Sequence, residues 1–181
     1  MSVKTIIAKR RSIRKYQDKK VPNVLIKELI DAARLAPSAY NAQPSKFFIV
    51  KDKITKQKLK QNSVFKQDFV YTAPVIIVCC ADRNVFPKER FEPVYSNPRE
   101  IGGELGAIRD LSIATQNLVL RATELGLGTC YVGLVNRDKI KEILDIPKNC
   151  IVPFVITLGY PAEKPRPTPR NEFKEFILNR F

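Results

Sequence analysis

The sequence predicts one α+β domain in which helices cover a sheet. Its 181 residues, 44% of them hydrophobic and 28% charged, have the size and composition of a single globular domain. Segments of strand and helix character mix without the regular alternation of a doubly wound parallel sheet, which favours the α+β class. No internal repeat is evident and nothing suggests a second domain, so residues 1–181 are expected to fold as one unit.

Two helices and a strand are expected in the first fifty residues. Ser2 suits the N-cap of a short helix over residues 2–9, whose apolar side chains would point inward. These side chains are Val3, Ile6 and Ile7. Apolar residues at helical spacing predict a second helix from residues 21–23 to about Arg34. Residues 47–50 have the composition of a strand.

The middle of the chain is expected to hold the central strand and the longest helix. After an exposed, lysine-rich helix over residues 54–62, the run over 73–81 is continuously apolar and rich in β-branched residues. Such a run predicts a strand covered on both faces. Residues 83–103 carry prolines and mixed charges without a period, and are expected to form a long loop or lid. Residues 105–125 predict a helix that is apolar on more than one side, and so buried in a core or a subunit interface.

The last third of the chain predicts two strands, two helices and an extended arm. The first three elements are a strand over 130–133, a helix over 137–144 capped by Asn136, and a strand over 152–158. Residues 159–170 cannot be helical, because alternate prolines remove amide donors and fix φ. A last helix over 172–178 would present an apolar face. An arm that ends in such a helix is expected to wrap a partner subunit.

The residue types exclude several chemistries. The chain has no histidine, which excludes Ser-His-Asp and Cys-His arrangements and histidine acid–base catalysis. An enzyme of this composition would leave the difficult chemistry to a cofactor. The four cysteines lack the C-x-x-C spacing of a zinc or redox site, so we expect reduced, mostly buried thiols and no metal. With no membrane-length apolar run and no signal-peptide core, the cytoplasm is the expected location.

The formal charge of +14 attracts anions of any kind. One class that it allows is a basic nucleic-acid-binding module. Such modules interleave aromatic and basic residues, and apart from Tyr16 the basic stretch over residues 9–16 does not. Nucleic-acid binding is therefore the less favoured class.

Three groups of polar residues are candidates for one ligand site. The cations and the hydroxyl of residues 10–14 suit a phosphate, because guanidinium groups offer planar forks of donors. These residues are Arg10, Arg11, Ser12 and Arg14. The loop over residues 38–43 offers amides and hydroxyls, and Arg170 ends the proline arm. The glycine-flanked segment 128–133 can bring backbone amides close to a flat ligand. Spacing alone leaves their convergence open.

These residues also carry a family resemblance. Residues 10–16 (RRSIRKY) and 36–44 (APSAYNAQP) resemble the opening motifs of the nitroreductase family of FMN flavoenzymes, R-R-S-x-R-x-[FY] and A-P-S-x-x-N-x-Q-P-W. Later segments agree in the same order: Asp110, Ala114, residues 116–118, Ala122, residues 125–133, residues 158–163 and Arg170. Ser45 stands where the family usually has tryptophan, so we expect different packing beside the loop.

The resemblance implies a nitroreductase-like fold and a homodimer with FMN at the subunit interface. The fold is a central mixed or antiparallel sheet flanked by helices, with a C-terminal arm on the partner subunit. Arg10, Arg11 and Ser12 would hold the flavin phosphate and ribityl chain, with Arg14 nearby and Arg170 as a second phosphate cation. The residues that would reach the flavin from the partner chain are Pro37, Ser38, Asn41 and Gln43. Those expected at the flavin ring are Gln67 and the backbone of Tyr131, Val132 and Gly133.

The reaction that the resemblance implies is ping-pong hydride transfer. NAD(P)H would reduce the flavin, which would then reduce an electron-poor small molecule such as a nitroaromatic, a quinone or an enone. No side chain would act as a catalytic residue, which agrees with the lack of histidine. The alternatives within the family are reductive dehalogenation and flavin fragmentation. Residues 83–103 would shape the substrate entrance, and the start of the chain suggests no ferredoxin-type extension.

Overall fold

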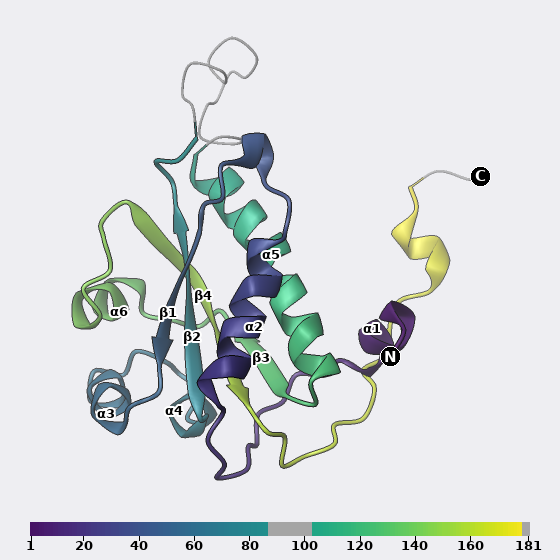
Figure 1. The fold of residues 1–181 in the computed structure, drawn as a ribbon, viewed down its shortest axis with the longest axis horizontal. Helices are drawn as coiled ribbons and strands as arrows, with labels where there is room; N and C mark the ends of the chain where they lie inside the picture. The colour runs from purple at the N-terminus through teal and green to yellow at the C-terminus, as the bar shows by residue number, and fades with distance from the viewer. Residues whose placement is uncertain (87–102, 179–181) are drawn as a thin grey trace.

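Four antiparallel strands form the centre of the protein (Figure 1). The computed structural model describes residues 1–86 and 103–178, so most of the loop expected over 83–103 lies outside the described residues. The strands are β1 (Ser45–Val50), β2 (Val75–Asp82), β3 (Gly128–Val132) and β4 (Cys150–Gly159). Their order is β1-β2-β4-β3, and each strand is antiparallel to its neighbours.

The interior strand β2 confirms the strongest strand prediction. Val78 lies opposite Phe48 of β1 and Val155 of β4, so β2 has a partner on each side. Residues 75–81 are all buried. Successive side chains of a strand point to opposite faces, and accordingly Ile77 joins the core on one face of the sheet and Val78 the core on the other.

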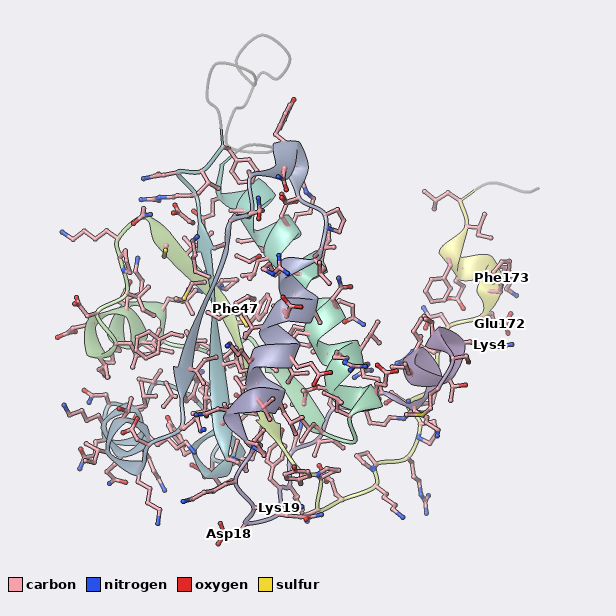
Figure 2. All side chains as sticks on the ribbon, in the orientation of Figure 1. Lys4, Asp18, Lys19, Phe47, Glu172 and Phe173 are labelled. Atoms are coloured by element: carbon pink, nitrogen blue, oxygen red, sulfur yellow. The ribbon has the colours of Figure 1, made fainter. Side chains whose placement is uncertain are left out.

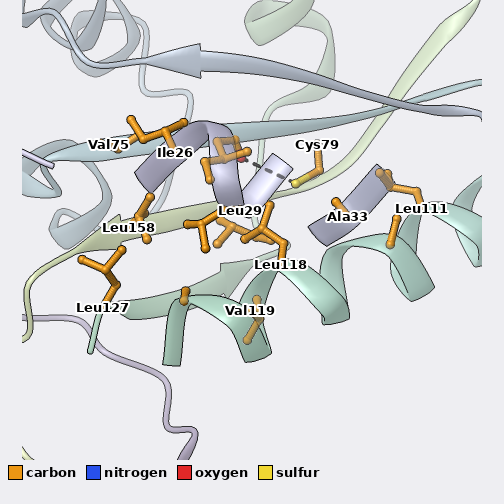
Figure 3. Close-up of a cluster of buried hydrophobic side chains, with 14 of the residues drawn as sticks. Ile26, Leu29, Ala33, Val75, Cys79, Leu111, Leu118, Val119, Leu127 and Leu158 are labelled. Atoms are coloured by element: carbon orange, nitrogen blue, oxygen red, sulfur yellow. Dashed lines mark hydrogen bonds between the residues drawn. The ribbon is translucent and has the colours of Figure 1, made fainter. Parts of the chain in front are cut away.

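Helices α2 (Asn23–Arg34) and α5 (Glu104–Glu124) cover one face of the sheet (Figure 1). Leu29 of α2 and Leu111 and Leu118 of α5 are fully buried in the cluster drawn in Figure 3. Nine residues of α5 are buried, and they recur every three or four residues along one side of the helix. Leu105 and Ile113, on the other side, are 57% and 40% exposed. The expected helix over 105–125 is therefore confirmed, but in a single chain only one side of it is buried.

Three shorter helices cover the other face: α3 (Lys53–Gln61), α4 (Phe69–Thr72) and α6 (Arg137–Ile143). Each contributes a fully buried side chain to the second core; these are Leu59, Val70 and Ile140. The predicted cap of α6 is confirmed, because the Asn136 side chain accepts a hydrogen bond from the Lys139 amide. The sequence analysis did not predict α4, since four residues are too few to show a helical period.

The N-terminal helix α1 (Val3–Lys9) has the predicted N-cap, but fewer of its apolar side chains are buried than predicted. The Ser2 side chain accepts a hydrogen bond from the Thr5 amide, as an N-cap should. Of its apolar residues only Ile6 is buried, while Val3 is 67% and Ile7 57% exposed. The prediction that all three point inward is wrong for a single chain, because α1 lies against the protein along one narrow face.

The C-terminal helix prediction is wrong. Residues 172–178 contain one 3-10 turn, η3 (Phe173–Phe176), instead of an α-helix. Phe173 and Phe176 are 74% and 68% exposed, so no core formed by the described residues stabilises the turn. Helices this short are unstable without tertiary packing. The arm before it is extended, as predicted, and reaches away from the sheet (Figure 1).

Two further expectations concern the cysteines and membrane-spanning segments. All four cysteines fall in the described residues, and each is a buried free thiol. None of the helices in residues 1–86 and 103–178 is long and apolar enough to cross a membrane.

Candidate functional site

The basic segment, residues 10–16, lies along the free edge of β3. The Ile13 amide donates a hydrogen bond to the Thr129 carbonyl at 2.9 Å, and Ser12 forms a parallel bridge with Thr129. The approach is close because Gly128 has no side chain; a Cβ there would lie 2.7 Å from Ile13 Cγ1. The segment thus closes a sheet edge and fixes the place of the neighbouring cations.

Gly128→Ala is expected to lower the free energy of unfolding by about 1–3 kcal/mol, since Ile13 must shift to accommodate the new methyl group. Chemical denaturation measures the change. Gly133→Ala is the matched control, because a Cβ at Gly133 meets nothing within 4 Å. Equal stabilities for the two variants would contradict the close packing of the basic segment on β3.

Three of the predicted phosphate residues gather beside Cys130. Burial raises the pKa of the Cys130 thiol, and the charge of Arg14, a hydrogen bond with Ser12 and the charge of Arg10 partly offset this effect. Arg11 differs, because its Nη1 donates to the carbonyls of Ala8 and Arg10, each at 2.7 Å. The salt bridges in the described part of the chain involve neither Arg10 nor Arg14, so these two guanidinium groups are available to an anionic ligand.

Glu163 fixes the backbone of this segment. Its Oε1 accepts hydrogen bonds from the amides of Arg14 at 2.5 Å and Lys15 at 3.0 Å. The backbone contact continues where the Ala162 amide donates to the Lys15 carbonyl at 2.9 Å. The start of the C-terminal arm therefore holds the basic segment. The sequence analysis noted Glu163 only as part of a motif and did not predict this contact.

The end of β3 places Tyr131, Val132 and Gly133 together. Val132 is buried, whereas Tyr131 is 39% exposed and packs edge-on against Phe154, with ring centroids 5.2 Å apart. Burial raises the pKa of Tyr131 to about 12, although a hydrogen bond with Thr115 acts in the opposite direction. The space above Gly133 leaves its backbone accessible to a flat ligand.

Gln67 lies near this strand end. The Asn136 amide donates to the Val64 carbonyl at 2.8 Å, and Phe65 forms an antiparallel bridge with Val135, so the segment that leads to Gln67 runs beside the one that follows Gly133. Gln67 Oε1 is buried and has no hydrogen-bond partner among the described residues. A buried acceptor without a partner costs free energy, and a ligand that donates to it would remove that cost.

The loop of residues 37–43 contains an unusual concentration of strained backbone. Tyr40, Asn41 and Gln43 all have positive φ, between 49° and 54°. Such angles cost free energy in residues other than glycine and occur often at binding sites. The Ser38 hydroxyl accepts a hydrogen bond from the Gln43 amide at 3.0 Å, which helps to hold this conformation.

A buried carboxylate ties the 37–43 loop to α5. Asp110 is 3% exposed; its Oδ2 accepts from the Ala39 amide at 2.8 Å, and its Oδ1 accepts from Arg109 Nε at 2.9 Å. The sequence analysis noted Asp110 only within the family motif. An acidic residue on the buried side of a helix was the signal that could have identified its role. Beside it, a hollow of about 250 Å³ is lined by Ser45, where the family usually has tryptophan.

One chain does not bring all the predicted residues together. The Leu127 amide donates to the Ala122 carbonyl, so β3 begins level with Ala122 on α5. Asp110, which holds the loop, is about 18 Å away from Ala122 along the helix, at 1.5 Å per residue. Arg170 lies in the exposed arm, where it donates to the Thr168 and Pro169 carbonyls. The structure therefore joins residues 10–14 to the first residues of β3, and leaves the loop and Arg170 apart from this contact.

A four-stranded antiparallel sheet flanked by helices, with a basic segment along its edge strand, defines a protein of the α+β class. A nitroreductase family protein of Clostridium difficile 630 has the same fold, with a TM-score of 0.79 and 30% identity over 98% of this chain and 96% of that chain. The model of the nitroreductase family matches residues 7–63 and 55–160. The chain belongs to the nitroreductase family.

Curated relatives indicate the class of reaction. A Thermus thermophilus protein named NADH dehydrogenase is 30% identical, with 98% of this chain and 96% of that protein covered. A Bacillus subtilis protein named FMN reductase [NAD(P)H] is 33% identical, with 88% of this chain and 66% of that protein covered. The protein is an NAD(P)H-dependent oxidoreductase of the nitroreductase type, as the sequence motifs predicted.

Proposed function

We propose that residues 1–181 form one FMN-binding domain of a cytoplasmic homodimer that uses NAD(P)H to reduce electron-poor small molecules. Nitroaromatics, quinones and enones are the acceptor classes. The observation that carries the proposal is the position of Ser12 on β3 with Arg10 and Arg14 near Cys130, and with no described salt bridge to neutralise either guanidinium.

The described residues fit FMN in kind. Arg10, Arg14 and Ser12 supply two cations and a hydroxyl for a phosphate and a hydroxylated chain. The accessible backbone of Gly133 suits a flat ring, and Gln67 Oε1 is a buried acceptor for an N–H of the pyrimidine edge. When bound, FMN would supply the hydride chemistry. The chain's own residues would bind, orient and shield it, with no side-chain base.

A homodimer would complete the site. Residues Pro37, Ser38, Asn41 and Gln43 would come from the second copy, in agreement with the separation of the 37–43 loop from the basic segment in one chain. The exposed apolar side chains of Val3, Ile7, Phe173 and Phe176 would be covered in the same assembly. Arg170, on the extended arm, would then supply its cation to the phosphate. Burial of such side chains is the usual driving force of subunit association.

The visible spectrum of the purified protein tests the proposal. We expect a yellow protein with flavin absorption and about one FMN per chain, which NADH or NADPH bleaches under anaerobic conditions and an added quinone or nitroaromatic restores. A protein that stays colourless after incubation with FMN would refute the proposal. Bleaching without reoxidation by any of the acceptors, together with a dehalogenated or fragmented product, would favour the other chemistries of the family.

A further inference from the structure

A second basic site lies on the side of the protein where residues 16–21 meet α3. A hollow of about 950 Å³ opens there, with six lysines and two aspartates in its lining. These are Lys19, Lys20, Lys51, Lys53, Lys56 and Lys60, with Asp18 and Asp52. Figure 2 shows Asp18 and Lys19 at the end of the molecule opposite the 37–43 loop. We refer to this feature as the lysine hollow.

The lysine hollow is a product of the tertiary structure. The lysines of residues 51–60 taken alone are the solvated face of a helix. The fold places Lys19 and Lys20, more than thirty residues earlier in the chain, on the same hollow. Six lysines against two aspartates leave an excess of four positive charges. The salt bridges of the described residues include none of these lysines.

Part of the positive charge is fixed in place. Lys56 Nζ donates to the carbonyls of Ala73 and Pro74 at 2.6 and 2.8 Å, so its ammonium group is held in the structure beside the hollow. Burial lowers the pKa of Lys56, which shows that the surroundings penalise its charge. An anion in the hollow would relieve this penalty.

Other lysines are free to bind. Lys19 Nζ lies 4.2 Å from the centre of the Tyr160 ring, which orients it without neutralising it. Lys20, Lys53 and Lys60 are exposed, and their ammonium groups make no salt bridge within the described residues. Asp52 is occupied as the cap of α3, where it accepts from the Thr55 amide at 2.7 Å.

We propose that the lysine hollow binds a small anion that carries two or more linked phosphates. Several ammonium groups around one hollow can each bind a different phosphate oxygen. A single phosphate group cannot contact all of these ammonium groups at once. The volume is large enough for a nucleoside polyphosphate and also for inorganic polyphosphate. The site is separate from the one proposed for FMN, since its lining residues include none of Arg10, Arg14 and Gln67.

Calorimetric titration of FMN-saturated protein with tripolyphosphate and with ATP tests the proposal. Saturation with FMN blocks the other phosphate site. We expect saturable binding of one anion per chain, and at least about tenfold weaker binding in a K20Q/K60Q variant, since hydrogen bonds to charged groups are worth about 1.5–3 kcal/mol each. Tighter binding of ATP than of tripolyphosphate would identify a nucleoside polyphosphate as the ligand, and the reverse would identify inorganic polyphosphate.

A control variant with the same net charge distinguishes binding at a specific site from general electrostatic attraction. K58Q/K148Q removes two exposed lysines outside the hollow and should bind both anions as the unaltered protein does. Equal loss in the two double variants would overturn the proposal, as would the absence of saturable binding. Tighter binding of duplex DNA, weakened equally by both double variants, would also overturn it. Both variants should retain FMN and NADH oxidation, which shows that they fold and leaves the proposed function to its own test.

Discussion

Replacement of Arg10 with alanine is expected to weaken FMN binding by about 10- to 100-fold. Each hydrogen bond between a guanidinium and a phosphate is worth about 1.5–3 kcal/mol, and the variant removes the whole guanidinium group. Arg10 lies close enough to Cys130 and Tyr131 for its charge to affect the pKa of both side chains, which places it beside β3. Quenching of FMN fluorescence as apoprotein is added gives the dissociation constant.

Lys9→Ala is the matched control for this prediction. Lys9 is the neighbouring cation, but its side chain is exposed and contacts only the sulfur of Met1 among the described hydrogen bonds. We expect its loss to change FMN affinity less than about threefold, because an exposed charge is screened by solvent and salt. If Arg10→Ala retains FMN as tightly as Lys9→Ala, the assignment of Arg10 to the phosphate is wrong.

Asp110→Ala should lower the free energy of unfolding by about 2–4 kcal/mol and reduce FMN retention at the same time. The substitution leaves the Ala39 amide without its acceptor and opens a space beside the partly exposed Arg109, at a site that is 3% exposed. The strained residues of the 37–43 loop then lose the contact that ties them to α5. Denaturant unfolding at fixed protein concentration and the flavin content of the purified variant are the two measurements.

Two further variants distinguish the effect of the loop contact from the effect of removing a charge. Asp110→Asn retains a carbonyl oxygen for the Ala39 amide and should recover most of the flavin content. Asp31→Ala breaks the exposed pair with Arg34 and should cost less than about 1 kcal/mol. Full flavin content in Asp110→Ala would contradict a role for this carboxylate in placing the loop.

Much of the secondary structure followed from local patterns. The continuous apolar run identified β2, the helical period identified α2 and α5, and Ser2 and Asn136 identified two helix starts. These signals are local, because a cap or a period depends only on residues a few positions apart. The same reasoning was wrong for residues 172–178, where none of the residues that the structure describes covers the apolar face.

The candidate site was predicted in part. The residue types at 10–14 pointed to a phosphate before any contact was known, because guanidinium chemistry can be read from single residues. The sequence could not separate Arg11, which turns to backbone carbonyls, from Arg10 and Arg14, which lie near Cys130. Nor could it show that Gln67 Oε1 has no described partner, since that depends on every neighbour of a buried atom.

The sequence by itself determined the α+β class, the main helices and strands, and the family, since these rest on periodicity and on motifs of adjacent residues. The tertiary structure alone decided which distant groups meet. The packing of the segments places residues 10–16 on β3, Asp110 under the 37–43 loop, and Lys19 and Lys20 on the same hollow as the lysines of α3. The pattern of residues along the chain indicates which side of a segment is apolar. A binding site depends on the relative positions of several segments, and a local pattern does not contain that information.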